Sequence, residues 1–159
     1  MIRVGIITVS DSSHEGSRID HSGPAVADRL QKGLYEVGPQ HVVPDEQKEI
    51  ATLLRHLADS GSVDVIFTTG GTGVARRDVT PEATRDVIDR EIPGLGELMR
   101  SKGSETTRFA PLSRALAGTR GAVLIINLPG SPKGAVESMD AVLELVPHVH
   151  DLLCGRTGH

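Results

Sequence analysis

The chain has 159 residues, of which 38% are hydrophobic and 24% are charged, and its formal net charge is −4 at pH 7. This size and composition predict one globular domain over residues 1–159 that buries its own core. The negative charge and the scarcity of aromatic residues argue against binding to nucleic acid or to an anionic membrane. Cys154 is the only cysteine, which excludes a disulfide framework and a thiolate metal cluster. No apolar run approaches a membrane span, so we expect a cytoplasmic protein.

The first half of the chain alternates apolar runs with amphipathic segments. The β-branched run at residues 2–9 predicts a buried strand, and the polar stretch 10–23 predicts a loop after it. Ser22 is placed to cap a helix whose apolar residues recur at helical spacing as far as Val37. Three further elements are expected: a short strand at 40–43, an amphipathic helix from Ile50 to near Gly61, and a strand at 63–69.

The second half continues the same alternation. Thr80-Pro81-Glu82 predicts a helix start, with a Thr cap, Pro at the first helical position and an acid in the first turn. Val87 and Ile88 are expected to face the core from this helix. Residues 101–118 carry too little pattern to assign. Three elements complete the chain: a short helix after the break at Pro93-Gly94, the most apolar strand at 122–127, and a final helix that reaches Val146.

This pattern predicts an α/β fold with a mostly parallel sheet that helices cover on both faces. In such folds ligands bind beyond the carboxyl ends of the strands. Three segments that follow strands carry unusual chemistry, namely residues 10–23, 69–80 and 127–134, and Asp45 follows a fourth strand. We therefore expect one active site where these segments converge.

The segment 68–84, TTGGTGVARRDVTPEAT, holds more chemistry than a turn requires. It is neither a P-loop, since no Gly-Lys-Ser/Thr follows the glycines, nor a dinucleotide fingerprint, since the third glycine is missing. A structural turn is the alternative to an anion-binding loop. Three kinds of phosphate contact are available: close backbone N–H groups at Gly70, Gly71 and Gly73, hydroxyl groups at Thr69 and Thr72, and guanidinium groups at Arg76 and Arg77.

Two carboxylates are candidate ligands of Mg²⁺. Asp78 lies between the arginines and the predicted helix start, and pairing with Arg76 or Arg77 is its alternative role. Asp45 could instead cap the helix that follows it. If the two loops converge, Asp45 and Asp78 could together hold Mg²⁺ through water, as hard oxygen ligands do beside nucleotide phosphates.

Two other loops can contribute to the same crevice. The segment 127–134, NLPGSPKG, leads into a helix whose N-terminus suits an anion, although a Pro-rich turn is its alternative. Ser10 and Asp11 directly follow the first strand and can reach the crevice as well. His14 and His21 lie in the same polar loop, but their spacing matches no metal site.

Four segments of the chain together resemble one family. They are VPDE, TTGGTG joined through three residues to RDVTPEA, PLSRALAGTRG, and NLPGSPKG, and they look like the molybdopterin adenylyltransferase family. That family comprises the bacterial MogA and MoaB proteins and the G domain of gephyrin, and the resemblance covers nearly the whole chain. It implies a three-layer α/β/α domain that assembles as a homotrimer, or as a hexamer in some MoaB proteins.

The resemblance also implies a reaction, in which molybdopterin and ATP give adenylyl-molybdopterin and pyrophosphate with the help of Mg²⁺. A molybdenum-insertion enzyme would use the product. The terminal phosphate of molybdopterin is ionised at neutral pH and attacks without a general base, so catalysis rests on alignment and charge neutralisation. Two alternatives are a non-catalytic carrier or scaffold that binds molybdopterin, and a regulatory module that binds only nucleotide. Retention of Asp45 and Asp78 favours the enzyme.

The resemblance assigns roles to individual residues. Asp45 and Asp78 match two carboxylates essential for adenylyl transfer, and Ser113 matches a residue on the molybdopterin side of the site. The resemblance also places the glycine loop at a pocket for the pterin phosphate, and the loop 127–134 at ATP or phosphate contacts. The other positions expected to contact substrate are Ser10, Asp11, Thr69, Gly70, Gly71, Thr72, Gly73, Arg77, Thr80, Pro81, Arg114, Asn127, Pro129, Gly130, Ser131 and Lys133.

Overall fold

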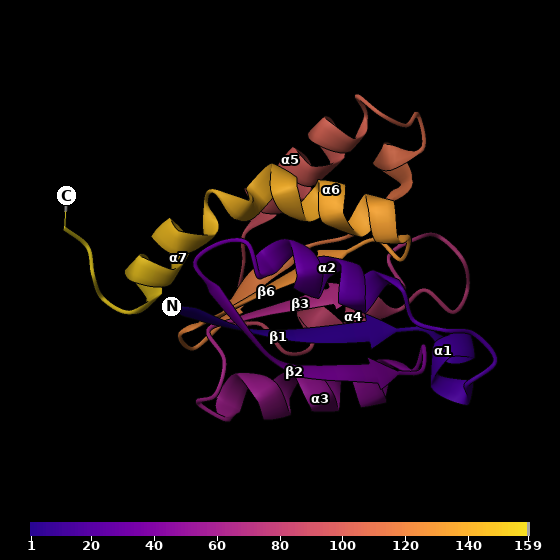
Figure 1. Ribbon diagram of the computed structural model, residues 1–159, viewed down its shortest axis with the longest axis horizontal. Coiled ribbons are helices and arrows are strands. Elements are labelled where there is room, and N and C mark those ends of the chain that lie inside the picture. Colours follow the sequence, from indigo (N-terminus) through magenta and orange to yellow (C-terminus); the bar gives the residue numbers. More distant parts are fainter. Residues whose placement is uncertain (159) are drawn as a thin grey trace.

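The computed structural model describes residues 1–158 and is built around a six-stranded sheet in the order β2-β1-β3-β6-β5-β4 (Figure 1). The strands are β1 (Ile2–Val9), β2 (Tyr35–Val43), β3 (Val65–Thr69), β4 (Arg90–Glu91), β5 (Ala117–Arg120) and β6 (Val123–Leu128). The helices are α1 (Asp11–Glu15), α2 (Ser22–Leu30), α3 (Gln47–Asp59), α4 (Thr80–Arg85), α5 (Pro93–Gly103), α6 (Pro132–Leu143) and α7 (Val146–Leu153), with a short 3-10 helix, η1 (Ala110–Leu112).

The parallel part of the sheet fixes where the loops meet. Strands β2, β1, β3 and β6 are mutually parallel, whereas β5 and β4 add an antiparallel edge. The predicted mostly parallel sheet is therefore confirmed, and its antiparallel edge was not foreseen. The four parallel strands end on one side of the sheet, beside α1 in Figure 1, so the loops that follow them lie together.

Two apolar layers hold helices against the sheet, as the three-layer prediction requires. On one face α2, α5, α6 and α7 pack around a cluster that includes Phe67 and Met139. On the other face α3 and α4 pack around a cluster that includes Ile66 and Leu54. Ile66 and Phe67 are neighbours on β3 that point to opposite faces, and all five residues of β3 are buried. This explains why the central strands read as unbroken apolar runs.

The predicted extent of the second helix and second strand is wrong. Helix α2 ends at Leu30, before Gly33, and Leu34 is 65% exposed. The chain already joins the sheet at Tyr35, five residues before the predicted start of the strand. Strand β2 continues through Pro39 because β2 is an edge strand, and its pairing with β1 shifts register at that point. An edge position and a register shift are where a sheet tolerates a residue with no N–H donor.

The start of α2 also differs from the prediction. Ser22 lies inside the helix and does not cap it, since its hydroxyl pairs with Thr69 at 2.8 Å. Asp20 takes the capping role, with its Oδ1 accepting a hydrogen bond from the Gly23 N–H at 3.2 Å. The polar stretch 10–23 is not a plain loop either, because it contains the one-turn helix α1, which Ser10 caps by accepting from the Ser13 N–H.

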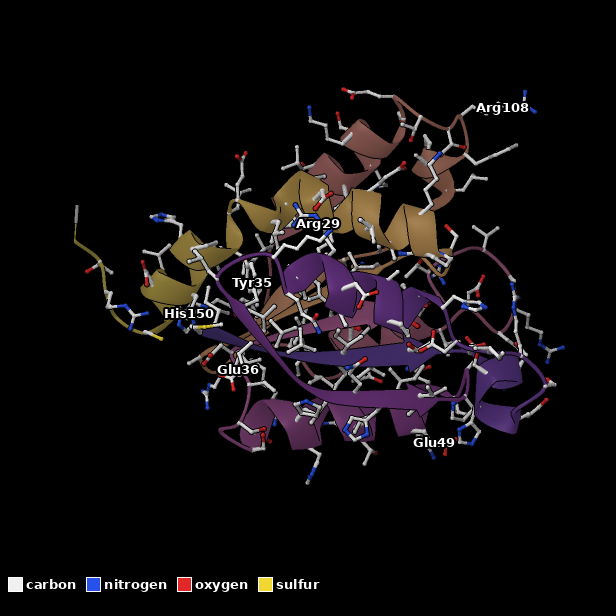
Figure 2. All side chains as sticks on the ribbon, viewed as in Figure 1. Arg29, Tyr35, Glu36, Glu49, Arg108 and His150 are labelled. Atoms are coloured by element: carbon white, nitrogen blue, oxygen red, sulfur yellow. The ribbon has the colours of Figure 1, made fainter. Side chains whose placement is uncertain are left out.

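The later helices are shorter than the sequence pattern predicted. Helix α4 ends at Arg85, so Val87 and Ile88 reach the core from the turn that follows. The final helix breaks after Leu143, and Val146 begins α7. The unassigned stretch 101–118 contains the end of α5, η1 and the first residues of β5. Arg108, near the middle of this stretch, lies at the upper right of the molecule in Figure 2. No helix within residues 1–158 is both long enough and apolar enough to cross a bilayer.

Candidate active site

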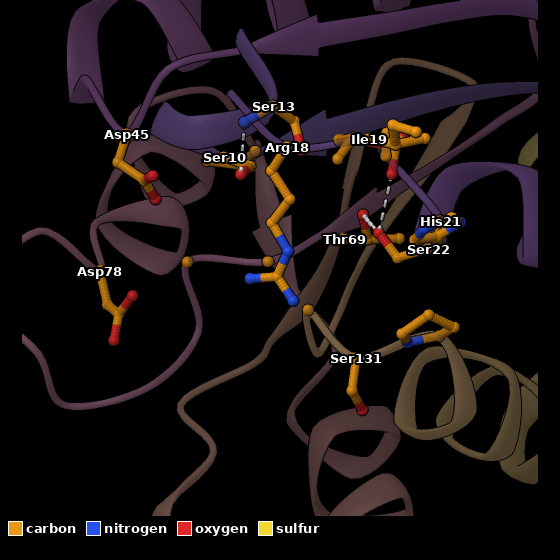
Figure 3. A pocket seen from close by; sticks show the side chains of 17 residues that line it. Ser10, Ser13, Arg18, Ile19, His21, Ser22, Asp45, Thr69, Asp78 and Ser131 are labelled. Carbon is orange, nitrogen blue, oxygen red and sulfur yellow. Dashed lines mark hydrogen bonds between the residues drawn. The ribbon is translucent and has the colours of Figure 1, made fainter. Parts of the chain in front are cut away.

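A cleft of about 420 Å³ lies where the loops after the four parallel strands converge (Figure 3). Its walls come from the end of β1 and the loop beyond it, the loop after β2, the glycine loop after β3, and the loop between β6 and α6. The expected convergence is therefore confirmed. Of the residues predicted for the site, the cleft is lined by Ser10, Asp45, Thr69, Gly70, Gly71, Asp78, Gly130 and Ser131.

The floor of the cleft is bare backbone. Gly70 and Gly71 have φ angles of 90° and 70°, in the left-handed region that favours glycine. A Cβ on Gly70 would collide with the carbonyl oxygen of Val9. A Cβ on Gly130 would lie 3.3 Å from the Cα of Gly70, so the two glycine loops touch backbone to backbone. The N–H and carbonyl of Gly70 are already bonded, to Leu128 and Thr80, so the Gly71 N–H is the donor that these two glycines offer to a ligand that approaches closely.

Thr80 fixes the glycine turn from below. It does not act as a helix cap, because its hydroxyl donates to the Gly70 carbonyl at 2.9 Å and its N–H donates to the Gly71 carbonyl at 3.1 Å. Thr80 and Pro81 are both buried and do not line the cleft. Thr80 thus supports the shape of the floor through its two hydrogen bonds to the glycine turn.

Asp11 and Asp45 join the ends of β1 and β2. The Asp11 N–H donates to Asp45 Oδ2, and the Asp45 N–H donates to Asp11 Oδ1, both at 2.9 Å. Arg77 binds Asp11 through two hydrogen bonds of 2.7 and 3.0 Å and also binds Glu46 at 2.8 Å. The guanidinium of Arg77 holds the pKa of Asp11 below its ordinary value. Asp45 therefore belongs to this network and does not cap α3, whose first turn follows Glu46.

Asp78 and Asp45 both face the cleft without a cationic partner among residues 1–158 (Figure 3). Asp78 Oδ2 accepts a hydrogen bond from the Ala75 N–H at 3.0 Å, so the alternative of a pair with Arg76 or Arg77 is wrong. Burial raises the pKa of Asp45, and the nearby charges of Asp11 and Asp78 raise it further. The cleft thus holds two carboxylates, those of Asp45 and Asp78, that form no ion pair with any residue among 1–158.

The donor set at these two carboxylates suits Mg²⁺. Within the described part of the chain, no three His, Cys, Asp or Glu residues gather as a complete metal site. Mg²⁺ is nevertheless commonly bound by one or two carboxylates, with substrate phosphates and water supplying the remaining ligands. Asp45 and Asp78 fit that incomplete set, because they face one cleft and lack a cation of their own.

A second, more apolar cavity of about 210 Å³ adjoins the cleft. Met99, Phe109 and Pro129 contribute apolar surface, and Ser113 lies in the wall. Ser131 lines both the cleft and this cavity, so it marks the boundary between them. The polar cleft and the apolar cavity together form a site with two chemically different halves.

Two predicted residues hold the site together from outside both cavities. Arg114 donates to the carbonyl oxygens of Gly73 and Asp78 at 2.7 Å each, and it forms an ion pair with Glu82. Asn127 is fully buried, with its Nδ2 donating to Thr84 at 2.9 Å and its Oδ1 accepting from the Leu116 N–H at 3.3 Å. Both side chains are committed to contacts within the protein.

Three more predicted residues do not reach the cleft or the cavity. The side chain of Lys133 is 86% exposed and lies 3.9 Å from Glu137. Thr72 is buried, and its carbonyl oxygen accepts from the Arg114 N–H at 2.7 Å. Gly73 lies beyond the floor, where a Cβ would stand 2.8 Å from Asp78 Oδ2. The cleft therefore uses the first two glycines of the loop but not the third.

Sequence reasoning missed two charged residues of the cleft, Arg18 and Asp20. Asp20 accepts hydrogen bonds from the hydroxyl groups of Thr8 at 2.7 Å and Ser22 at 3.3 Å, in addition to its capping bond. An Asp three residues before Gly23 at a helix start is a signal that could have identified this cap. Arg18 belongs to no motif, and only the fold brings it to the cleft.

The family model described as "probable molybdopterin binding domain" matches residues 5–148, a range that contains every predicted site residue. The chain belongs to this family. Two molybdopterin adenylyltransferases illustrate the relationship within it. The one from Helicobacter pylori is 41% identical over 157 residues, covering 98% of this chain and 89% of that protein. The one from Escherichia coli is 42% identical over 144 residues, covering 89% and 73%.

Solved structures of the molybdopterin-binding family agree with the fold. A molybdopterin biosynthesis enzyme, MoaB from Thermus thermophilus, is 53% identical and superposes with a TM-score of 0.92 over 98% of both chains. A tungsten cofactor synthesizing protein, MoaB from Pyrococcus furiosus, is 36% identical with a TM-score of 0.86, again over 98% of both chains. The predicted family and three-layer α/β/α fold are thereby confirmed.

Proposed function

We propose that this protein transfers the adenylyl group of ATP to molybdopterin and releases pyrophosphate. The observation that carries the proposal is the side-chain-free floor at Gly70 and Gly71 beside the carboxylates of Asp45 and Asp78, which form no ion pair among residues 1–158. A polyphosphate can lie against such a floor, and a cation at the carboxylates can balance its charge. The relatives that carry the name molybdopterin adenylyltransferase support the same reaction.

The reaction requires alignment more than acid–base chemistry. An oxygen of the terminal phosphate of molybdopterin attacks the α-phosphorus of ATP, and a new P–O bond forms. The bond from the α-phosphorus to the bridging oxygen breaks, and its electron pair leaves with pyrophosphate. A phosphate monoester carries about two negative charges at neutral pH, so the attacking oxygen needs no general base. The protein's task is to hold two polyanions in line and to balance their charge.

Asp45 and Asp78 would hold Mg²⁺ at the edge of the floor. When bound, Mg²⁺ neutralises phosphate charge and orients the phosphate oxygens. Asp45 contributes a carboxylate that burial makes costly to ionise without a nearby cation. Its two hydrogen bonds with Asp11 keep that carboxylate at the mouth of the β1 and β2 loops.

The two halves of the site suit the two substrates. The resemblance assigned the glycine loop to the pterin phosphate. The proposal differs: the polar cleft takes the phosphates of ATP, and the more apolar cavity beside Ser113 takes the pterin. The acceptor phosphate would then lie near Ser131, which borders both spaces. This arrangement places the attacking and leaving groups on either side of one boundary residue.

The deciding experiment combines purified protein, ATP, molybdopterin and MgCl₂, and it measures adenylyl-molybdopterin and pyrophosphate. We expect equimolar formation of both products, with loss of both when Mg²⁺ is chelated. Molybdopterin binding without pyrophosphate release would instead identify a carrier. ATP binding without molybdopterin binding would identify a regulatory module.

The proposed assembly is a homotrimer, with a hexamer as the alternative, on the strength of the resemblance to the MogA and MoaB proteins. The proposed product, adenylyl-molybdopterin, would pass to an enzyme that inserts the metal. Such a transfer needs no nucleic acid or membrane partner.

A further inference from the structure

The Arg18 side chain extends into the cleft with nothing to bind. Figure 3 shows it reaching into the space that has Asp45 and Asp78 on one side and Ser131 on the other. The residue is exposed, and among residues 1–158 its guanidinium forms neither a hydrogen bond nor an ion pair. A guanidinium offers five N–H donors in a fork that matches phosphate, so its place in this cleft calls for a ligand.

Arg18 is the only arginine or lysine among the described residues that line the cleft. None of the basic residues singled out from the sequence lines the cleft, and Arg76 lines neither the cleft nor the apolar cavity. Arg77 binds Asp11 and Glu46, and Arg114 binds Glu82 and two carbonyl oxygens. Lys133 lies outside both cavities. Arg18 is therefore the one arginine or lysine side chain within residues 1–158 that the lining of the cleft offers to substrate phosphates.

The backbone around Arg18 is firmly held although the side chain is free. The N–H groups of Ser17 and Arg18 both donate to the Ser12 carbonyl, at 3.1 and 3.2 Å. Two residues further on, Asp20 is fixed by its bonds to Thr8, Ser22 and the Gly23 N–H. The backbone that carries Arg18 is thus held in place before a ligand binds, so little backbone entropy is lost on binding.

The charges in the cleft also need a cation on the side away from the carboxylates. Mg²⁺ at Asp45 and Asp78 would neutralise phosphate oxygens on that side only. As the bond from the α-phosphorus to the bridging oxygen breaks, negative charge accumulates on the departing pyrophosphate. A preorganised donor stabilises the transition state when it meets charge that develops during the reaction.

We propose that Arg18 binds the phosphate chain of ATP and neutralises the charge that develops on the leaving pyrophosphate. Arg18 would thus be a catalytic residue that contacts the leaving group, whereas Asp45 and Asp78 serve the metal side. This inference rests on the proposed adenylyl transfer, and its test must separate a failure of one from a failure of the other.

The test compares Arg18→Gln, Arg18→Lys and the control Arg90→Gln. Arg90 is exposed on the two-residue edge strand β4 and lines neither cavity. Its variant therefore removes the same positive charge at a position outside the proposed active site. We expect Arg18→Gln to lower kcat for pyrophosphate release about 100-fold, as loss of one donor to developing charge does. Arg18→Lys should retain more activity, about tenfold below wild type, because it keeps the charge but loses the fork. Arg90→Gln should stay within twofold of wild type.

A second measurement uses inorganic pyrophosphate with MgCl₂ as the probe in calorimetric titrations of the same proteins. Arg18→Gln should bind pyrophosphate at least tenfold more weakly than wild type and Arg90→Gln. If wild type forms no adenylyl-molybdopterin, the proposed function fails, and the titration alone decides the contact between Arg18 and phosphate. Equal pyrophosphate affinity for wild type and Arg18→Gln, or a kcat of Arg18→Gln within twofold of an active wild type, would overturn the role of Arg18.

Discussion

Gly71 offers a measurement of how tightly the floor of the cleft is built. Replacement by alanine forces a Cβ onto a residue with φ of 70° and drives it into the Thr80 hydroxyl. The same Cβ would lie 3.2 Å from Asp45 Oδ1. Gly61 is the matched control, because its φ is 75° and a Cβ there meets nothing within 4 Å. The two variants share the backbone strain and differ only in the contacts.

The expected losses of stability follow from the backbone strain and from the side-chain contacts. Left-handed backbone costs a residue with a Cβ roughly 1–2 kcal/mol, which both variants bear. Only Gly71→Ala displaces the Thr80 hydroxyl from the Gly70 carbonyl. A buried acceptor left without its partner costs about 1–3 kcal/mol. Gly71→Ala should therefore lower the free energy of unfolding by about 1–3 kcal/mol more than Gly61→Ala, and it should still fold, since domains are typically stable by about 5–15 kcal/mol.

Urea denaturation of both variants and wild type at one protein concentration measures these differences, and the fixed concentration removes any effect of association. Pyrophosphate release is measured on the same samples. We expect Gly61→Ala to react like wild type and Gly71→Ala to lose roughly 100-fold, because displacement of a catalytic group by about 1 Å costs that much. Equal losses of stability, together with normal turnover by Gly71→Ala, would refute the role of this turn in supporting the site.

Four further results are expected. Asp78→Asn should abolish most pyrophosphate release while molybdopterin affinity measured by titration stays near that of wild type, and unchanged turnover would remove Asp78 from the metal site. Asp45→Asn should also lose turnover. It should be at least as stable to urea as wild type at pH 7, because the raised pKa of Asp45 means that its ionised form opposes folding at that pH. A large loss of stability would contradict this reading. Ser113→Ala should weaken molybdopterin binding more than ATP binding, whereas equal loss of both would indicate a purely structural serine. Arg77→Gln should reduce the free energy of unfolding at pH 7. Its difference in stability from wild type should shrink as pH falls below about 3.8 and Asp11, whose pKa is lowered, becomes protonated. A difference in stability that does not change with pH would mean that the Arg77–Asp11 ion pair adds nothing.

The sequence predicted the architecture because the local patterns agree with the global fold. The central strands are unbroken apolar runs since residues such as Ile66 and Phe67 pack on opposite layers of helices. The same reasoning failed at β2, where apolar residues at helical spacing extended the predicted helix to Val37 and delayed the predicted strand to residue 40. An edge strand with a register shift accommodates Pro39, but being at the edge is a property of the whole sheet that local sequence does not contain.

The site could be predicted only in part, because local sequence does not show which distant residues the fold brings together. Sequence reasoning located the glycine turn, Asp45 and Asp78, because each follows a recognisable strand. It could not separate the arginines, since whether a guanidinium is free depends on which acid the fold places beside it. Arg77 is bound by Asp11, which lies 66 positions away in the chain, whereas Arg18 stays free in the cleft. Tertiary contacts decide which of several similar side chains remains available.

The touching glycines at the floor divide the site into a fixed part and an adjustable part. Gly70 is bonded to the Leu128 carbonyl at 3.0 Å, and Gly130 abuts its Cα, so the loops after β3 and β6 form one block. Gly70 cannot accept a side chain without a shift of the backbone at Val9, and a Cβ on Gly130 would press against Gly70. Any widening of the entrance for a bulky pterin must therefore come from the outer rim, at the segments that carry Arg18 and Phe109. Changes of substrate preference would accordingly require substitutions in the rim segments, while the glycines of the floor stay the same.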